Sequence, residues 1–244
     1  MESTDDAPAT EREFGAVVPF LPTGSLDAIA TEMGTDKRSA KHDYMRFYEA
    51  LLSGYRDQKF TMLELGVGIP SRRAPSLRTW KEFFPNADIV GMDIREVSKE
   101  FEESRVHVEI GDASSPKALR RIFRRWKPSI VLDDASHFWS HQILGFKTLF
   151  PMLPPGGIYI CEDVHTSFSG EPGQSKYADC DESFWQLVAR LQTAIASGKS
   201  HPHISDRHEQ RMVAWIDAIL VSRKTVAILK RQKSRKRDLP KAKS

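Results

Sequence analysis

The sequence predicts an α/β fold in which a mostly parallel sheet is covered by helices on both faces. Five short apolar runs alternate with segments whose apolar residues recur at helical spacing, a pattern typical of repeated strand–helix units. The runs are apolar throughout, as expected for strands that are buried on both faces. The 244 residues, with 40% hydrophobic and 28% charged side chains, are typical of one globular domain with a sizeable core.

Two helices are predicted ahead of the sheet. The segment 25–35 begins with Ser25, a favourable N-cap residue, and ends near Gly34. In the segment 42–56, apolar side chains recur at positions i, i+3, i+4, i+7 and i+8, which places them on one face of a helix. This face consists of Tyr44, Phe47, Tyr48, Leu51 and Leu52.

The strands and the remaining helices follow in order. The predicted parallel strands are residues 60–68, 87–94, 106–113, 129–134 and 156–163. The predicted helices are residues 75–86, 116–126, 140–153 and 182–197. Two last strand-like runs, 214–222 and 224–231, are close enough in sequence to form an antiparallel hairpin. The prediction is therefore a seven-stranded, mostly parallel sheet that ends in this hairpin.

The net charge of +3 is unevenly distributed along the chain. Residues 230–244 contain eight Lys/Arg and one Asp, so this segment carries +7 and the rest of the chain carries −4. Such a segment is typical of a solvated chain end or of a contact with nucleic acid. No aromatic side chain interleaves with the charges to stack on bases, which favours the solvated end. We therefore predict a disordered acidic N-terminus at 1–20, a folded domain at 21–231 and a disordered basic tail at 232–244.

Cysteine usage and hydropathy indicate a cytoplasmic protein. The two cysteines, Cys161 and Cys180, are too few for a disulfide framework, and Cys161 lies within an apolar run. No stretch of about 18 apolar residues predicts a membrane span. The acidic N-terminus lacks the basic and apolar regions of a secretory signal.

Polar residues at the ends of the first three strands point to a nucleoside ligand, because ligands of open parallel sheets bind beyond the carboxyl ends of the strands. The first strand ends in Gly66 and Gly68, but Ser71 stands where a dinucleotide fingerprint has its third glycine. Asp93 ends the second strand and can accept hydrogen bonds from ribose hydroxyls. Asp112 follows the third and can accept one from an adenine amino group. Together these residues favour a nucleoside cofactor without a pyrophosphate, a description that fits S-adenosylmethionine.

Carboxylates gather at the ends of the next two strands, where Asp133 and Asp134 follow one apolar run and Glu162 and Asp163 follow the other. If these strands are neighbours, repulsion between the four groups raises their pKa values unless a cation is present. Carboxylate oxygens form a hard site that suits Mg²⁺ or Mn²⁺. His137, predicted one helical turn beyond Asp134, suits proton abstraction better than binding of a hard metal ion. The alternative is that one Asp caps a helix, the other acids form ion pairs and His137 lies on the surface.

Motifs along the chain also resemble those of a known family. In order they are GTDK (34–37), HDY (42–44), LELGVG (63–68), SLRTWKEFFPNADIVGMDI (76–94), DDASH (133–137) and LFPMLPPGGIYICEDVHTS (149–167). They are similar to motifs of metal-dependent class I methyltransferases that O-methylate deoxysugars of macrolides and related natural products, such as mycinamicin and rhamnosyl O-methyltransferases. The DDASH and ED motifs are the specific part of the resemblance, which extends from Thr31 to Phe168 and more loosely to Lys230.

The resemblance implies a Rossmann-like class I methyltransferase fold. It also implies an antibiotic-biosynthesis enzyme that uses S-adenosylmethionine and Mg²⁺ to methylate a sugar hydroxyl. The implied metal ligands are Asp134, Glu162 and Asp163, and the implied general base is His137. The implied cofactor contacts are Thr35, Glu64, Gly66, Ser76, Asp93 and Asp112. We add Asp133, for which the alternative role is to cap the turn. In one departure from the family, Ala74-Pro75-Ser76 replaces Gly-Gly-Ser, which stiffens this loop.

The sequence also admits three other interpretations. A nucleic-acid methyltransferase would use the basic tail, but base amino-methylases usually carry Asn/Asp-Pro-Pro-Tyr/Phe where this chain has Asp-Asp-Ala-Ser-His. Relatives known as cephalosporin hydroxylases share the same motifs with different chemistry. A non-catalytic binding module is disfavoured by the intact His137 and carboxylates. The expected partner is a small-molecule glycoside held by loops near residues 165–177, without a membrane partner, and a homo-oligomer is compatible with the sequence.

Overall fold

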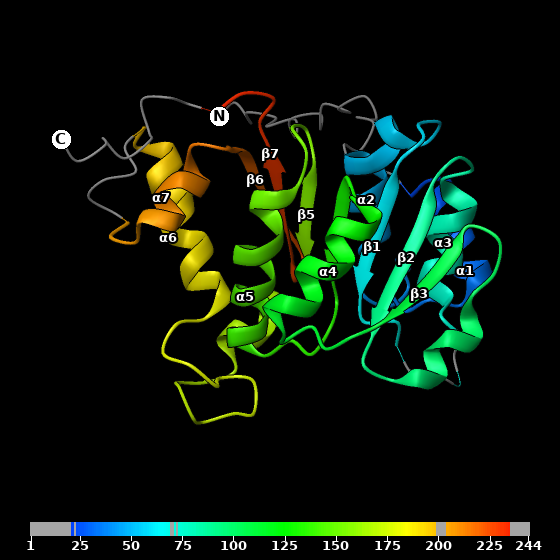
Figure 1. The fold of residues 1–244 in the computed structure, drawn as a ribbon, viewed down its shortest axis with the longest axis horizontal. Coiled ribbons are helices and arrows are strands. Elements are labelled where there is room, and N and C mark those ends of the chain that lie inside the picture. Colours follow the sequence, from blue (N-terminus) through cyan, green and yellow to red (C-terminus); the bar gives the residue numbers. More distant parts are fainter. Residues whose placement is uncertain (1–20, 22, 69–70, 72, 199–203, 235–244) are drawn as a thin grey trace, which may run out of the picture.

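A seven-stranded mixed sheet forms the centre of the molecule (Figure 1). The computed structural model describes residues 21, 23–68, 71, 73–198 and 204–234. The strands are β1 (Thr61–Leu65), β2 (Asp88–Asp93), β3 (Val106–Ile110), β4 (Ile130–Asp133), β5 (Ile158–Cys161), β6 (Ile216–Ser222) and β7 (Thr225–Lys230). Their order is β3-β2-β1-β4-β5-β7-β6; β1 to β5 pair in parallel, and β7 runs antiparallel to both β5 and β6. The predicted α/β fold, with its mostly parallel sheet and C-terminal antiparallel hairpin, is confirmed.

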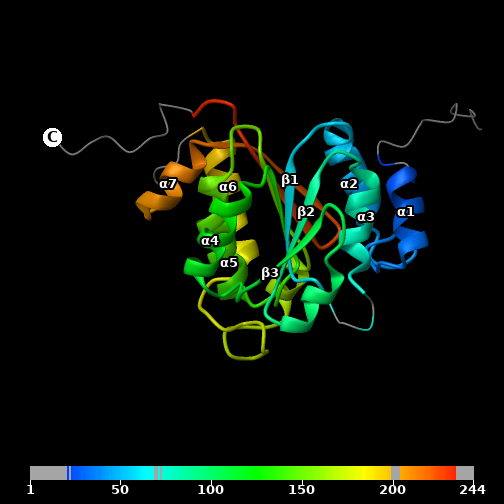
Figure 2. The same ribbon diagram turned by 45° about the vertical axis from the view of Figure 1, so that its right-hand side comes forward.

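Helices cover both faces of this sheet. They are α1 (Ser25–Met33), α2 (Met45–Leu52), α3 (Pro75–Phe83), α4 (Pro116–Trp126), α5 (Trp139–Leu149), α6 (Phe184–Ala196) and α7 (Arg207–Val213). Figure 2 shows α1, α2 and α3 on one side of the sheet and α4, α5 and α6 on the other. Among the described residues, no helix combines the length and apolar character that crossing a membrane requires.

Two hydrophobic cores lie between the sheet and its helical layers. Successive side chains of a strand point to opposite faces, so Met62 of β1 packs toward α1–α3 and Leu63 packs toward α4–α6. The helical face predicted around Tyr44 and Tyr48 is buried in the first of these cores. Each fully buried apolar side chain contributes about 1.5–3 kcal/mol to stability, so both layers are firmly attached to the sheet.

The short helix α7 was not predicted. Its seven residues, RHEQRMV, contain only two apolar side chains, so no periodic apolar face marks it. Tertiary contacts stabilise it instead. The Asp206 side chain accepts a hydrogen bond from the Glu209 N–H at 2.8 Å, and the Glu209 carboxylate forms ion pairs with Lys147 and Arg190, both at 2.6 Å.

The connections leave a crevice at the carboxyl ends of β1 and β4. The chain passes from β1 through α3 to β2, on one side, and from β4 through α5 to β5, on the other. These neighbouring strands therefore send their following segments in opposite directions. Such a point of divergence is where open α/β sheets bind ligands, and it positions the site described below.

Lys230 belongs to the sheet and not to a basic tail. It is the last residue of β7 and is only 7% exposed. Its Nζ donates hydrogen bonds of 3.3, 2.7 and 2.6 Å to the backbone carbonyls of Phe150, Pro151 and Leu153. Two of the eight basic residues in the segment 230–244 are thus part of the folded domain, since Arg231 also pairs with Asp217 at 2.8 Å. Residues 235–244 and 1–20 lie outside the described part of the chain, so their predicted disorder stays a prediction.

Lys230→Met is expected to lower the free energy of unfolding by about 2 to 3 kcal/mol, because it leaves buried carbonyl oxygens without a donor. Urea denaturation of the variant and the wild type measures this difference. Lys233→Met is the matched control, because Lys233 is exposed and we expect a change within about 0.5 kcal/mol. Equal losses in the two variants would contradict the role given to Lys230.

Candidate active site

A continuous cleft opens beyond the carboxyl ends of β1 to β4. It consists of two adjoining cavities of about 370 and 490 Å³, whose walls share Gly66, Gly68, Asp134 and Ala135. The smaller, here called the acidic cavity, is lined by polar residues that include Asp134, Glu162 and Asp163. The larger, here called the apolar cavity, is lined by residues that include Met92, Ile94 and Ala113. The cleft lies at the crevice between β1 and β4.

Gly66 forms the junction between the two cavities. Its φ is +89°, which favours glycine, and a Cβ at this position would collide with the carbonyl oxygen of Asp134. Gly66 N donates a hydrogen bond to Met92 O at 2.8 Å, and Asp134 N donates one to Leu65 O at 3.0 Å. The backbone pairing therefore continues past the strands and brings the ends of β1 and β4 together.

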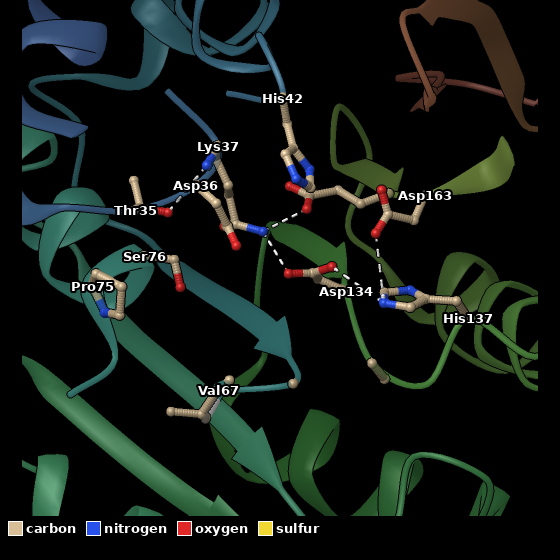
Figure 3. A pocket seen from close by; sticks show the side chains of 14 residues that line it. Thr35, Asp36, Lys37, His42, Val67, Pro75, Ser76, Asp134, His137 and Asp163 are labelled. Carbon is tan, nitrogen blue, oxygen red and sulfur yellow. Dashed lines mark hydrogen bonds and ion pairs between the residues drawn. The ribbon is translucent and has the colours of Figure 1, made fainter. Parts of the chain in front are cut away.

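A buried lysine lies among the carboxylates of the acidic cavity (Figure 3). The Nζ of Lys37 lies 2.5 Å from both Asp134 Oδ2 and Glu162 Oε2, and 3.9 Å from Glu64 Oε1. Its side chain is 3% exposed. Burial lowers the pKa of Lys37, but the charges of Asp134, Glu162 and Glu64 outweigh it and raise this pKa well above the ordinary value. Lys37 therefore carries a positive charge inside the cavity.

Two tyrosines at the start of the α2 region hold the neighbouring acids of β5. Tyr48 OH donates a hydrogen bond to Glu162 Oε1, and Tyr44 OH donates one to Asp163 Oδ1, both at 2.6 Å. Both tyrosines are buried, and burial raises the pKa of each phenol, so both remain donors. With Lys37 on its other oxygen, Glu162 has both carboxylate oxygens in hydrogen bonds.

His137 lies at the mouth of the acidic cavity. Its Nε2 is 3.6 Å from Asp163 Oδ2 and 4.0 Å from Asp134 Oδ1, and its side chain is 23% exposed. The prediction that it sits one helical turn beyond Asp134 is wrong: α5 begins at Trp139, and His137 precedes it with φ +61°. The Thr166 hydroxyl donates a hydrogen bond to the His137 carbonyl at 3.1 Å, and this contact helps to hold the left-handed backbone.

Asp134, His137 and Asp163 together could hold a metal ion. One carboxylate oxygen from each acid and one ring nitrogen lie within 4.8 Å of one another. The carboxylate oxygens fit Mg²⁺, which proteins usually bind through one or two carboxylates together with water and substrate oxygens. Glu162 lies next to this group, but its oxygens contact Lys37 and Tyr48. Its role as a third metal ligand stays a prediction.

Asp93 faces the apolar cavity but already has partners. Its Oδ1 accepts hydrogen bonds from the backbone and the Nε of Arg95, both at 2.9 Å, and its Oδ2 accepts one from Val67 N at 3.1 Å. Arg95 Nη2 also lies 2.8 Å from Asp93 Oδ2 and donates to the carbonyl of Gly68. Burial raises the pKa of Asp93, yet these hydrogen bonds outweigh it and the pKa is lowered. A ribose at Asp93 therefore has to share this carboxylate with Arg95.

The remaining wall of the apolar cavity comes from β3 and α5. Asp112 lines the cavity and accepts a hydrogen bond from Ser114 N at 2.8 Å. Ser136 Oγ and His141 Nδ1 lie 2.7 Å apart on the opposite wall. Ile94, although 67% exposed, lines the same space and offers a flat apolar contact for a base.

Three other residues predicted to contact the cofactor lie on or behind the wall of the acidic cavity. Thr35 and Ser76 line it directly. Glu64 is fully buried behind it, where its Oε2 accepts a hydrogen bond from Trp80 Nε1 at 2.9 Å. Its other oxygen, Oε1, makes no hydrogen bond and lies 3.9 Å from Lys37 Nζ. An unpaired buried acceptor in this position suits a donor group supplied by a ligand.

Glu64→Gln is expected to change how stability depends on pH. Burial, partly offset by Lys37, raises the pKa of Glu64 from 4.5 to about 7. Because the folded state binds this proton more tightly, wild-type stability falls as pH rises from 4.5 to 7, by up to about 3 kcal/mol. The variant should lack this pH-dependent part of the free energy of unfolding. Urea denaturation of both proteins at pH 5 and pH 8 measures the difference. Parallel pH profiles for the two proteins would contradict the raised pKa.

Asp133 points away from the cleft. Although it was grouped with the cofactor contacts, it does not line either cavity. Its Oδ2 accepts a hydrogen bond from Tyr159 OH at 2.7 Å, and burial raises its pKa to about 6. Asp133 is still part of β4, so its side chain and that of Asp134 leave the backbone on different sides. Its 3.4 Å contact with Ala135 N agrees with the alternative role of holding the turn.

Several side chains of the cleft were not assigned a role from the sequence. They are Lys37, Tyr44, Tyr48, Arg95, Ser136 and His141. Lys37 is part of the GTDK motif, and its place in that motif could have indicated a role in the site. Tyr44 and Tyr48 were assigned to an apolar face, because periodicity describes the rings and says nothing of the hydroxyl groups.

Comparisons with known proteins identify relatives of this chain. No family model matches it. It is 39% identical over 165 residues to 8-demethyl-8-alpha-L-rhamnosyl tetracenomycin-C 2′-O-methyltransferase of Streptomyces olivaceus. The aligned region covers 66% of this chain and 43% of the relative. The chain is 36% identical over 175 residues to mycinamicin VI 2″-O-methyltransferase of Micromonospora griseorubida, covering 70% and 44%. The chain thus spans less than half the length of these relatives.

Solved structures agree with these sequence similarities. The structure of MycE methyltransferase from the mycinamycin biosynthetic pathway, in complex with Mg, SAH and mycinamycin VI, matches with a TM-score of 0.72 and 29% identity. The match covers 87% of this chain and 56% of that one. A second MycE structure, with Mg and SAH, gives a TM-score of 0.74 and 30% identity. The chain therefore has the Rossmann-like methyltransferase fold and is a homologue of the sugar O-methyltransferases of macrolide and tetracenomycin pathways, as its motifs predicted.

Proposed function

We propose that this chain is an S-adenosylmethionine- and Mg²⁺-dependent O-methyltransferase that acts on a sugar hydroxyl of a glycosylated natural product. The observation that carries the proposal is the meeting of Asp134, His137 and Asp163 beside a second cavity with the features of a nucleoside site. Relatives that are 36–39% identical are named for methyl transfer to such sugars, which supports the substrate class.

The apolar cavity would hold the adenosine part of the cofactor. Asp93 would accept hydrogen bonds from the ribose, sharing its oxygens with Arg95, and Asp112 would accept one from the adenine amino group. Ile94 would pack against the base. The methionine end would pass Gly66 into the acidic cavity, where Thr35 and Ser76 lie on the wall.

The acidic cavity would hold the metal ion and the acceptor. When bound, S-adenosylmethionine would supply an electrophilic methyl group, and a divalent cation held by Asp134 and Asp163 would supply positive charge that lowers the pKa of an acceptor hydroxyl. His137 takes the proton of the acceptor hydroxyl on Nε2 and so makes its oxygen nucleophilic. Asp163, 3.6 Å from Nε2, then stabilises the charged imidazole. The chain contributes mainly positioning and charge stabilisation.

A screen of methyl transfer over glycosylated natural products tests the proposal. Each glycoside is paired with its aglycone and incubated with methyl-labelled S-adenosylmethionine, with Mg²⁺ or with EDTA. We expect transfer to a glycoside, none to its aglycone, and loss of transfer in EDTA. RNA and DNA are included as acceptors, because the basic segment after residue 230 suggested a nucleic-acid methyltransferase.

Two results of this screen would contradict the proposal. Transfer that persists in EDTA would remove the metal ion from the mechanism. Transfer to nucleic acid but to no glycoside would show that the acceptor is nucleic acid and not a sugar. Deletion of residues 235–244 would then be expected to reduce methyl transfer to nucleic acid.

A further inference from the structure

Among the described residues, Lys37 is the only lysine or arginine in an ion pair with two of the predicted metal ligands. Its ammonium group lies 2.5 Å from an oxygen of Asp134 and 2.5 Å from an oxygen of Glu162. It is held in a wall of the cleft by its backbone, since the N–H groups of Tyr44 and Met45 donate to the Lys37 carbonyl at 3.0 and 3.3 Å. The lysine therefore belongs to a defined part of the site and is not a surface side chain in chance contact.

The ammonium group occupies two carboxylate oxygens, Asp134 Oδ2 and Glu162 Oε2, that a metal ion bound by both acids would need. Mg²⁺ binds carboxylate oxygens at about 2.0–2.1 Å. The oxygens Asp134 Oδ2 and Glu162 Oε2 cannot approach Mg²⁺ this closely while both contact Nζ at 2.5 Å, since the two cations would then be in contact. Repulsion between like charges at such a distance in a buried site is strong.

The surrounding acids account for the position of the lysine. Glu64, Asp134 and Glu162 all lie within 3.9 Å of Lys37 Nζ, and Asp163 lines the same cavity. Without a positive charge, these carboxylates would repel one another in a region of low dielectric. The lysine supplies that charge from within the chain.

We propose that Lys37 is an internal cation that stabilises the carboxylates of the site when no metal ion is bound, and that a divalent metal ion displaces it. Metal binding then frees Glu162 to become a ligand beside Asp134 and Asp163. Because Thr35 and Asp36 line the same cavity two positions or fewer from Lys37, its withdrawal alters the wall next to the methionine end of the cofactor. This inference rests on the proposed metal site, so its tests measure metal binding and lysine exposure and do not depend on methyl transfer.

The first test uses the wild-type chain and an amine-acylating reagent. Peptide mass spectrometry follows acetylation of Lys37 with and without saturating Mg²⁺. Displacement should raise the rate at Lys37 about tenfold or more, because the ion-paired amine is protected and the released amine is not. Lys41, which is exposed, and Lys230, which is buried away from the cleft, are internal controls whose rates should not change. An unchanged rate at Lys37 with metal bound would overturn the proposal.

The second test measures Mn²⁺ affinity by electron paramagnetic resonance in two variants. Lys37→Gln removes the competing charge and should tighten Mn²⁺ binding about tenfold or more. Glu162→Gln removes a ligand that becomes available on displacement and should weaken binding about tenfold or more. Circular dichroism confirms that each variant is folded.

The outcomes separate the inference from the proposed function. If the wild type binds Mn²⁺ while Lys37→Gln binds it no more tightly, or Glu162→Gln binds it equally well, Lys37 is a permanent partner of Glu162 and the displacement proposal fails alone. If neither the wild type nor Lys37→Gln binds Mn²⁺, the proposed metal site is contradicted. The metal dependence of the proposed function is then contradicted as well.

Discussion

The His137→Ala variant is expected to transfer methyl groups about 10²- to 10⁴-fold more slowly than the wild type, the usual contribution of a general base. The imidazole lies between Asp134 and Asp163 at the mouth of the acidic cavity and is 23% exposed, so an acceptor hydroxyl can reach it. Cofactor affinity should stay within about threefold, since His137 does not line the apolar cavity. Single-turnover rates and calorimetric titration with S-adenosylhomocysteine measure the two quantities separately.

His165→Ala is the matched control for this experiment. His165 also lies near Asp163, with Nδ1 3.6 Å from Oδ1, but it is 49% exposed and does not line the acidic cavity. Its removal should change the rate at saturating acceptor less than about threefold, and any effect on the predicted acceptor loop 165–177 should appear in KM. If the two histidine variants were equally slow, the loss would come from the charge around Asp163 and not from a base at His137.

Asp163→Asn is expected to weaken Mg²⁺ binding by about 100-fold or more and to lower methyl transfer in proportion at limiting Mg²⁺. The substitution removes an anionic oxygen from the group of Asp134, His137 and Asp163, while the amide oxygen can still accept the hydrogen bond from Tyr44. The fold should therefore persist. Isothermal titration with Mg²⁺ and rates over a range of Mg²⁺ concentrations provide the measurement.

Excess Mg²⁺ distinguishes a lost ligand from a lost structure in this variant. A weakened site should regain a large part of its rate when Mg²⁺ is raised about 100-fold, whereas a distorted site should not. Asp57→Asn, on an exposed turn away from the cleft, should bind Mg²⁺ like the wild type. Normal Mg²⁺ affinity in Asp163→Asn would exclude Asp163 as a ligand.

Much of the fold was predictable because local patterns and global topology agree in this chain. Continuous apolar runs marked the five parallel strands. Apolar spacing, or for α1 an N-cap serine with helix formers, marked six of the seven α-helices in the described part of the chain. The exception, α7, depends on ion pairs of Glu209 with Lys147 and Arg190, residues distant in sequence that no local pattern connects. The start of α5 was predicted within one residue, but the spacing of Asp134 and His137 was taken for a helical turn, whereas His137 precedes the helix with a left-handed backbone.

The site was predictable to the extent that strand ends meet at one edge of a sheet. That rule brought Asp93, Asp112 and Asp134 to one cleft. It could not reveal Lys37, which reaches Asp134 and Glu162 across 97 and 125 residues of sequence from a loop before the sheet. The position of Asp133, in contrast, was predictable. Side chains alternate along a strand, so the consecutive acids Asp133 and Asp134 could have been expected to point to different sides.

The contacts of Tyr44 and Tyr48 show that the candidate site includes residues that precede the sheet in sequence. These phenols are four positions apart and bind two consecutive acids of the chain, Asp163 and Glu162. Every strand of the sheet lies after residue 60, yet a fragment cut just before β1 would lose both phenols and Lys37. Such a fragment keeps the complete sheet while its acids lose their donors and their internal cation. The segment before the sheet therefore contributes side chains to the candidate site, and a fragment chosen to contain the sheet alone would lack them.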